Sequence, residues 1–292
     1  MGSVHLKRRT PMTFTCGRFS FALSRPLIMG ILNVTPDSFS DGGRYVDHAA
    51  AVAHAHALVD AGADIIDIGG ESTRPLAQAI SQQEEMDRVL PVLEQLSTLD
   101  IALSLDTRHA AVMREGLARQ VDLINDVSAL SDPASLALLA DSRAGVCLMH
   151  KQGDPHTMQH RPHYQDVVSE VHAYLTQRLE IALEAGIARE RILIDPGFGF
   201  GKTVAHNFAL LAQLPRFATL APVLVGLSRK SMLAAVTGAP NPRVAGLPAS
   251  VTAAVLAAQR GAAVVRVHDV AETRQALQVW AAVEAACHEE SQ

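Results

Sequence analysis

Several residue types that mark whole classes of protein are scarce in this sequence. Cysteine occurs 3 times in 292 residues and never as Cys-x-x-Cys, which excludes a disulfide scaffold and a structural zinc site and favours a reducing compartment. Aromatic residues make up 4%, too few for the base-stacking platforms of RNA-binding modules. Lysine and arginine total 25 against 30 acidic residues, and the net charge of −5 argues against a nucleic-acid partner.

Long apolar runs are missing as well. One of the longest uncharged stretches, 244–259, contains Pro248 and is shorter than the roughly 20 apolar residues that a spanning helix needs. Near the start, Lys7 to Arg9 precede polar residues rather than an apolar segment, so we predict no signal peptide, no membrane partner and a cytoplasmic location. We expect residues 1–12 to form a polar tail and residues 13–292 a single domain.

What the sequence does contain is a regular alternation of two kinds of segment. Short apolar runs occupy residues 26–32, 64–68, 101–105, 122–124, 145–149, 191–194, 222–225 and 262–267. Alanine-rich segments with helical periodicity lie between them, among them 47–61, 82–97, 166–185 and 271–286. Eight strand–helix units in one chain predict an α/β fold of the (β/α)8 TIM-barrel type. A doubly wound open sheet is the alternative, and it would need fewer strands or a second domain.

A further β-segment precedes the first of these runs. Residues 13–21 alternate on both sides of Gly17, which predicts a β-hairpin. We expect Phe14, Phe19 and Phe21 to plug the bottom of the barrel.

Each apolar run ends in a polar residue or in glycine followed by polar residues. In a barrel, the carboxyl ends of all strands meet at one rim, where the chemistry takes place. The residues at these ends are Asn33, Gly69 to Arg74, Asp106, Asn125, His150, Asp195, Gly226 to Lys230, and Arg266 to His268. We therefore predict one pocket surrounded by acids, amides and cations.

The rim residues fall into two chemical groups. Asp106, Asn125 and Asp195 offer acceptors for a flat heterocycle with an amidine-like edge, because buried carboxylates need donors. Arg266 and His268 lie two apart and share a strand face, so we expect an anion site there together with Asn33.

The glycine-rich segment 197–203 matches neither phosphate-binding pattern. Pro196 replaces the first glycine of a P-loop, and Lys202 replaces the third glycine of the dinucleotide fingerprint. The segment either presents Phe200 to a ligand or is an ordinary turn, and the residues leave both open. His150 is interpreted as hydrogen-bonded into the rim rather than as a ligand-binding group. The loops at 35–43 and 71–74 are rich in hydroxyls and charge, which is typical of lids and of solvated turns.

The rim motifs resemble those of one known family. Residues 29–43 and 67–75 are similar to the two signatures of the dihydropteroate synthase family, and residues 148–150, 195–202, 226–231 and 266–270 continue the match. The resemblance implies a pterin-binding TIM barrel of folate biosynthesis. Such an enzyme joins 6-hydroxymethyl-7,8-dihydropterin diphosphate to 4-aminobenzoate by an SN1-like substitution that releases diphosphate. It further implies Mg²⁺, a homodimer and a target of sulfonamides.

The resemblance also assigns roles to residues. The pterin site would comprise Asp106, Asn125, Met149, Asp195 and Lys230. The 4-aminobenzoate site would comprise Thr73, Arg74, Pro75, Phe200 and Ser228. Diphosphate would contact Asn33, Arg266 and His268, with Mg²⁺ on Asn33 and on Asp37 or Asp41. The catalytic set would be Asn33, Thr73, Lys230, Arg266 and His268.

The sequence departs from the family at three places. Leu76 stands where glycine is expected, Lys151 where methionine is common, and Gly246 to Pro248 where serine or threonine is usual. We expect the first to stiffen the loop after the second strand and the others to be peripheral. Three rival functions stay open: a related barrel that transfers methyl groups from folate to a corrinoid protein, a silent pterin-binding paralogue, and a sugar-phosphate enzyme on the same fold.

Overall fold

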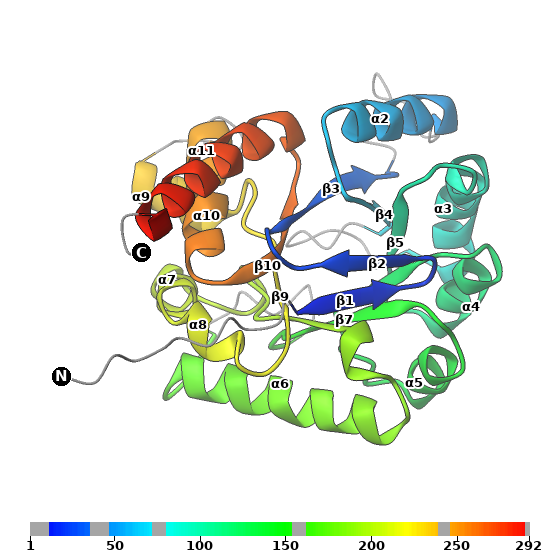
Figure 1. The fold of residues 1–292 in the computed structure, drawn as a ribbon. Helices are drawn as coiled ribbons and strands as arrows, with labels where there is room; N and C mark the ends of the chain where they lie inside the picture. Colours follow the sequence, from blue (N-terminus) through cyan, green and yellow to red (C-terminus); the bar gives the residue numbers. More distant parts are fainter. Residues whose placement is uncertain (1–11, 36–46, 72–79, 154–161, 239–245, 290–292) are drawn as a thin grey trace.

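The structure, a computed structural model, describes residues 12–35, 47–71, 80–153, 162–238 and 246–289. Eight parallel strands close into a barrel in the order β10-β3-β4-β5-β6-β7-β8-β9 (Figure 1). The strands are β3 (Leu27–Asn33), β4 (Ile65–Gly69), β5 (Ala102–Asp106), β6 (Leu123–Asp126), β7 (Gly145–Met149), β8 (Ile192–Asp195), β9 (Val223–Val225) and β10 (Ala262–Val267). All eight predicted runs are strands, which confirms the barrel and rules out the open sheet.

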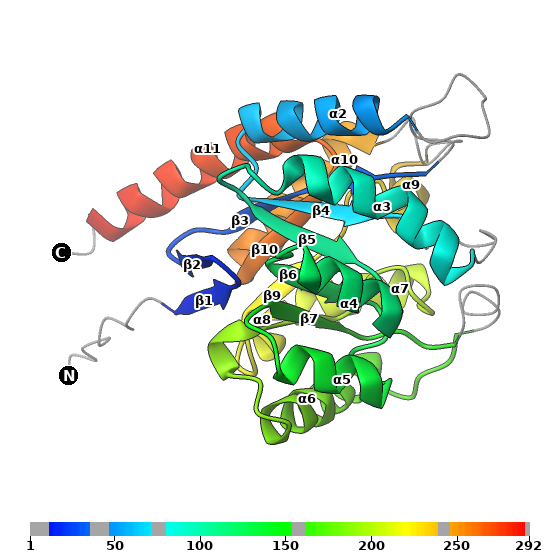
Figure 2. The ribbon, with the colours of Figure 1, turned by 90° about the vertical axis from the view of Figure 1, so that its right-hand side faces the viewer.

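Helices surround the barrel and connect its strands (Figures 1 and 2). They are α2 (His48–Asp60), α3 (Gln82–Leu96), α4 (Ala110–Ala118), α5 (Pro133–Ala140), α6 (Val167–Glu184), α7 (Val204–Ala212), α8 (Leu214–Phe217), α9 (Ser231–Thr237), α10 (Gly246–Gln259) and α11 (Val270–Glu289). Several begin directly after a capping residue: Asp47, Ser81 and Asp166 each accept a hydrogen bond from a backbone N–H of the first turn. Within the described residues, no helix is long and apolar enough to cross a membrane.

Side chains fill the lower half of the barrel with a single apolar layer. The layer takes one inward-facing residue from each strand, Met29, Ile65, Ala102, Leu123, Cys147, Leu193, Leu224 and Val264, and Leu27 lies below Met29 on β3. Because side chains alternate across a strand, the residues two positions further on also face inward, toward the carboxyl-end rim. The barrel is therefore a packed core below and a candidate pocket above.

An antiparallel hairpin of β1 (Thr13–Cys16) and β2 (Phe19–Ala22) closes the end from which the strands start (Figure 2). Phe14 and Cys16 are buried in the apolar layer, and Phe19 and Phe21 pack against it half-buried. The predicted plug is confirmed, with Cys16 as an additional member.

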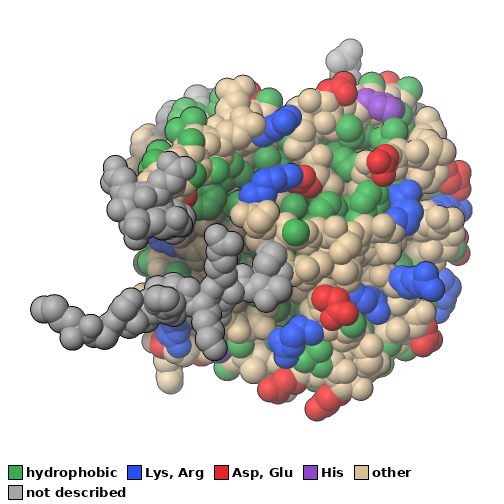
Figure 3. Space-filling view, viewed as in Figure 1, with side chains coloured by type: hydrophobic (Ala, Val, Ile, Leu, Met, Phe, Trp, Pro, Cys, Tyr) green, Lys and Arg blue, Asp and Glu red, His purple; other side chains and the backbone are tan. Residues whose placement is uncertain are grey.

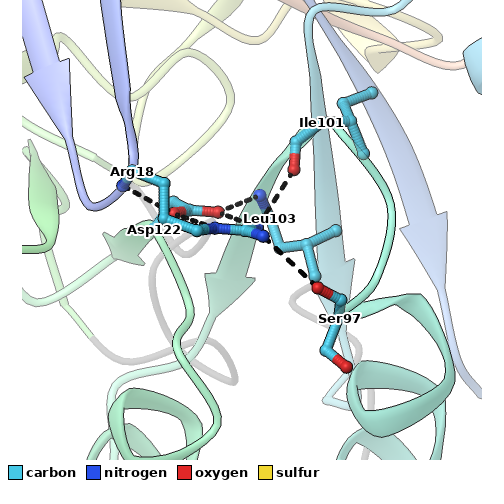
Figure 4. A network of polar contacts seen from close by, with 5 residues as sticks. All are labelled: Arg18, Ser97, Ile101, Leu103 and Asp122. Atoms are coloured by element: carbon cyan, nitrogen blue, oxygen red, sulfur yellow. Dashed lines mark hydrogen bonds and ion pairs between the residues drawn. The ribbon is translucent and has the colours of Figure 1, made fainter.

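One ion pair fastens the hairpin to the barrel (Figure 4). Arg18 donates to Asp122 from its backbone N, from Nε and from Nη2, at 3.0, 3.1 and 2.8 Å. The backbone N–H of Leu103 donates a fourth hydrogen bond to the same carboxylate at 3.0 Å. The guanidinium also donates to the carbonyls of Ser97 and Ile101. Asp122 therefore joins the hairpin to the starts of two strands.

Two sequence departures can be placed. Gly246 to Pro248 form the first turn of α10, where a proline is tolerated because the first backbone N–H groups have no helical partner. Lys151 is half-buried directly after His150. Leu76 lies outside the described residues, as does the predicted tail except for Met12.

Candidate active site

A polar layer lies directly above the apolar layer of the barrel. Its members are the residues two positions after those of the apolar layer on five strands: Asp67, Ser104, Asn125, Asp195 and Arg266. Asp106 follows Ser104 by two and faces the same way. The predicted pterin residues on β5, β6 and β8 and the predicted anion residue on β10 thus meet in the mouth of one barrel.

Arg266 is held by two carboxylates. Its Nε donates to Asp67 at 2.5 Å and its Nη2 donates to Asp106 at 2.7 Å. Burial works against the guanidinium charge, but the two neighbouring carboxylates more than offset this and raise the pKa of Arg266. The arginine therefore stays charged at the floor of the pocket.

Asp67 is a site residue that the sequence prediction missed. It is fully buried, and it accepts hydrogen bonds from Ser104 Oγ at 2.5 Å and Asn125 Nδ2 at 3.2 Å as well as from Arg266. The amide NH2 of Asn125 points at Asp67, so its oxygen is the group that can accept from a ligand. A signal existed: an acid in the middle of an apolar strand is costly unless it is paired.

Asp195 ends β8 and is 6% exposed. The backbone N–H of Gly197 donates to its Oδ1 at 2.7 Å. Burial raises the pKa of Asp195 to about 6, although the Gly197 hydrogen bond and Lys230 act in the opposite direction. The carboxylate is ionised at neutral pH and has acceptor capacity beyond this one bond.

Lys230 lies at the N-cap of α9, after β9, which stands between β8 and β10 in the closed barrel. Its Nζ is 4.4 Å from the centroid of the Phe200 ring, a cation–π contact. Burial lowers the pKa of Lys230 to about 8. Phe200 therefore lies in the pocket, which favours the ligand-presenting interpretation of the glycine segment over an ordinary turn.

The remaining predicted residues lie around the same rim. Nδ1 of His268 is 2.9 Å from Ser228 Oγ, so these two predicted residues contact each other. Asn33 ends β3, which lies between β4 and β10, and its side chain is half-buried. Met149 ends β7 and is buried.

The glycine turn is fixed by a buried lysine that the prediction also missed. Lys202 is 3% exposed, and its Nζ donates to the carbonyl oxygens of Gly197 at 2.8 Å and Phe200 at 3.0 Å. The same atom lies 2.9 Å from Nδ1 of His150, which confirms that this histidine is hydrogen-bonded into the rim. Burial lowers the pKa of Lys202 to about 7 and that of His150 to about 3. Nothing in the local sequence distinguishes Lys202 from a surface lysine.

Several predicted residues cannot be placed. Thr73, Arg74 and Pro75 of the 4-aminobenzoate prediction, and Asp37 and Asp41 of the metal prediction, lie outside the described residues. Within the described ranges, no group of three or more His, Cys, Asp or Glu side chains is placed to hold a metal ion.

Comparison with known proteins agrees with this geometry. The model of a family described as pterin binding enzymes matches residues 29–268. Dihydropteroate synthase of Neisseria meningitidis serogroup B is 51% identical over 276 residues, covering 91% of this chain and 96% of that protein. The Escherichia coli K12 enzyme of the same name is 48% identical over 263 residues, with coverage of 89% and 92%.

Solved structures show the same similarity. Dihydropteroate synthase of Xanthomonas albilineans with 4-aminobenzoic acid has a TM-score of 0.88 and 51% identity, covering 95% of this chain and 99% of that one. The Burkholderia cenocepacia enzyme complexed with 7,8-dihydropteroate has a TM-score of 0.87 and 46% identity, with coverage of 96% and 99%.

Proposed function

This chain belongs to the dihydropteroate synthase family of pterin-binding enzymes, and from that premise we propose how its residues carry out the reaction. The enzyme is a transferase that joins 6-hydroxymethyl-7,8-dihydropterin diphosphate to 4-aminobenzoate, giving 7,8-dihydropteroate and diphosphate. One observation carries the residue assignment: Asp195, Asn125 and Asp106 lie in the barrel mouth that also contains Arg266. Acceptors for a heterocycle thus lie beside a cation for its leaving group.

The pterin binds to the acceptors of the floor and to Lys230, which follows the strand next to Asp195. Asp195 accepts hydrogen bonds from the amidine-like N–H edge of the pterin, and the Asn125 oxygen accepts another. Lys230 donates to an acceptor on the ring, while Asp106 lines the floor and Met149 packs beside the ring. The buried position of these groups strengthens each hydrogen bond relative to water.

Diphosphate departs toward Arg266 and His268. Two of the five N–H donors of Arg266 bond to Asp67 and Asp106, and no other described residue takes up the rest, so they can contact phosphate oxygens. Fixing the guanidinium in advance places positive charge where negative charge grows in the transition state, at no reorganisation cost. Asn33 completes this anion site from β3.

We propose Mg²⁺ as the cofactor, with Asn33 as the member of its donor set that lies within the described residues. Mg²⁺ keeps several waters and takes a few protein oxygens plus substrate phosphates, so the side-chain oxygen of Asn33 with Asp37 or Asp41 would suffice. When bound, the ion would supply Lewis-acid stabilisation of the leaving diphosphate.

4-Aminobenzoate lies beside the Phe200 ring and Ser228, with Thr73, Arg74 and Pro75 as further contacts. The departing diphosphate leaves a cationic methylene, which the electron-rich dihydropterin stabilises. The aniline nitrogen is already a free nucleophile at neutral pH, so the residues need only position it and exclude water. Sulfonamides would compete at this same site, as the Yersinia pestis enzyme in a sulfonamide drug complex suggests (46% identity, TM-score 0.88).

The enzyme acts as a homodimer, and an apolar surface supports this proposal. A groove of about 620 Å³ runs between α7, α9 and α10, lined by Phe208, Leu233, Val236 and Leu256. Val236 and Leu247 are exposed beside it, as are Val279 and Val283 on α11, and hydrophobic side chains gather over α11 in the upper left of Figure 3. An apolar face of this kind is typical of an interface with a second copy.

A substitution on that face tests the dimer. We expect Val236→Asp to convert the protein to a monomer in analytical ultracentrifugation, because a charge would be buried without a partner. Met12→Asp, at an exposed residue beside the hairpin and away from the groove, is the control and is expected to leave the sedimentation coefficient unchanged.

Location and domain extent complete the proposal. The thiols of Cys16 and Cys147 are buried and free, which supports a reducing compartment such as the cytoplasm. We treat residues 13–292 as one domain because the hairpin packs into the barrel core.

The activity is tested directly. Purified protein is incubated with the pterin diphosphate, 4-aminobenzoate and Mg²⁺, and both the condensed product and released diphosphate are measured. We expect equal amounts of the two. Diphosphate release without condensed product would refute the transfer to 4-aminobenzoate, and absence of both would refute the function.

A further inference from the structure

Lys202 joins two parts of the rim that are far apart in the sequence. Its ammonium group contacts Nδ1 of His150 at the end of β7, and the carbonyl oxygens of Gly197 and Phe200 in the turn after β8. It also lies 3.4 Å from the carbonyl oxygen of His150. One buried group thus bonds to both ends of the turn and to the neighbouring strand.

The turn itself is built to lie against β7. Gly197 and Gly199 have φ of +70° and +82°, in the left-handed region that favours glycine. A Cβ at Gly197 would overlap the carbonyl oxygen of His150, and one at Gly199 would lie 3.3 Å from Lys230 Cδ. Gly197 therefore lies against the end of β7 with no room for a side chain, and the carbonyl groups of Gly197 and Phe200 accept from Lys202.

The same short segment carries residues of both proposed substrate sites. Asp195, which we assign to the pterin, is the last residue of β8 and is fixed by the barrel. Phe200, which we assign to 4-aminobenzoate, lies five residues later, outside any strand or helix, with its ring over Lys230. Its position therefore depends on what holds the turn.

We propose that Lys202 is a positioning residue for 4-aminobenzoate: its ammonium group fixes the Gly197 to Phe200 turn on β7 and so holds the Phe200 ring against Lys230. The identity of the substrate rests on the proposed function. The fixing of the turn by Lys202 is independent of that function. It predicts a split between the two substrates, since loosening the turn moves Phe200 and leaves Asp195 on its strand.

Other contacts keep the turn folded when the ammonium is removed. The Gly199 N–H donates to Asn207 Oδ1 at 2.8 Å, and the Tyr164 hydroxyl donates to the Gly201 carbonyl at 3.0 Å. We therefore expect a variant at Lys202 to loosen the turn rather than unfold the rim.

The experiment compares Lys202→Met, which keeps the length of the side chain and removes its donors, with Lys151→Met as a matched control one residue beyond His150. We expect Lys202→Met to raise the KM for 4-aminobenzoate about tenfold, equivalent to about 1.4 kcal/mol of lost binding, and to leave pterin affinity by calorimetry within about threefold. Lys151→Met is expected to change neither. Lys202→Gln keeps two N–H donors and should give an intermediate KM. It replaces Lys202→Met in the comparison if that variant does not fold.

Hydrogen–deuterium exchange of the unliganded variants separates this inference from the proposed function. We expect faster exchange of the amides between Gly199 and Gly201 in Lys202→Met, and unchanged exchange in β8. Faster exchange in a protein whose wild type makes no product would support the role of Lys202 in fixing the turn and refute the enzymatic function. An active wild type with unchanged exchange and unchanged KM in Lys202→Met would refute the positioning role. Equal losses for both substrates would also refute it, because they indicate general structural damage.

Discussion

Two buried carboxylates at opposite ends of the barrel show how this protein separates stability from binding. Asp122, at the bottom, accepts four hydrogen bonds from Arg18 and the Leu103 N–H, which uses the full acceptor capacity of a carboxylate. Asp195, at the rim, accepts one hydrogen bond from Gly197 among the described residues. All acceptor sites of Asp122 are therefore occupied by groups of the protein, whereas Asp195 has acceptor sites left for a ligand.

The largest effect is expected from removing the saturated carboxylate. Asp122→Ala removes the acceptor of three Arg18 hydrogen bonds and of the Leu103 N–H, and leaves the guanidinium only its longer bonds to the Ser97 and Ile101 carbonyls. We expect the free energy of unfolding to fall by about 3 kcal/mol, the lower end for broken buried ion pairs, because the Arg18 side chain is 36% exposed. Denaturant titration measures this. The KM values of the remaining folded protein should not change. A changed pterin affinity would contradict the idea that the bottom of the barrel serves stability and the rim serves binding.

The unsaturated carboxylate should show the reverse behaviour. Asp195→Asn keeps the shape and the acceptor for Gly197 but loses the charge that binds the pterin edge. We expect the dissociation constant of a pterin analogue to rise about 100-fold, equivalent to about 2.7 kcal/mol, with little change in melting temperature. Isothermal titration calorimetry and a thermal melt give the two numbers. A large drop in melting temperature with normal affinity would show that Asp195 serves stability rather than pterin binding.

The pKa of Asp195 adds a pH dependence to that prediction. Because burial raises this pKa to about 6, the carboxylate takes up a proton as the pH falls through 6 and loses its acceptor role. In the wild type, pterin affinity should therefore weaken below pH 6, whereas in Asp195→Asn it should stay flat over the same range.

The bottom of the barrel can be predicted from the sequence more completely than the rim. Eight apolar runs and an alternating segment around Gly17 suffice to predict the barrel and its plug, because burial on both faces forces that composition on each strand. Asp106 and Asn125 could be predicted because they close runs. Asp67 could not be assigned in the same way, since its partner Arg266 is 199 residues away in the chain.

Lys202 marks a second limit of the sequence. It stands in a glycine segment with no apolar pattern around it, and its burial arises only because the turn folds back on β7. Long-range packing of this kind leaves no local periodicity to read.

Glu85 tests whether every unsaturated carboxyl near the rim is a binding group. It lies in the first turn of α3 and is 0% exposed. Within the described residues its oxygens form no hydrogen bond of normal geometry, although the Thr107 side chain lies close enough to act against the rise in pKa, and His109 Nε2 is 3.9 Å away. Burial raises its pKa from 4.5 to about 7. Since the folded pKa is the higher one, the protonated form stabilises the fold below pH 4.5, and that stabilisation is lost as the pH rises through 7.

We therefore expect Glu85→Gln to raise the free energy of unfolding by about 2 kcal/mol at pH 8, to leave it nearly unchanged at pH 4, and to leave both KM values alone. Glu84→Gln is the matched control. Glu84 is half exposed and pairs with Arg88 one turn away, so its loss should cost only about 0.5 kcal/mol. A weaker pterin affinity in Glu85→Gln would instead place Glu85 in the binding machinery.

The smallest effect is expected from an exposed ion pair at the bottom. Arg25 donates to Asp64 at 2.8 and 2.6 Å, a geometry as good as that of Arg18 with Asp122, but the Arg25 side chain is 58% exposed. Water can replace its hydrogen bonds, and Asp64 keeps the one from the Ile28 N–H. Arg25→Ala should therefore lower the free energy of unfolding by about 0.5 kcal/mol, and Arg18→Ala by several times more. If the two arginine variants were equally destabilised, the number of donors rather than burial would decide stability at this end, and Asp122 would owe its effect to the hairpin it holds.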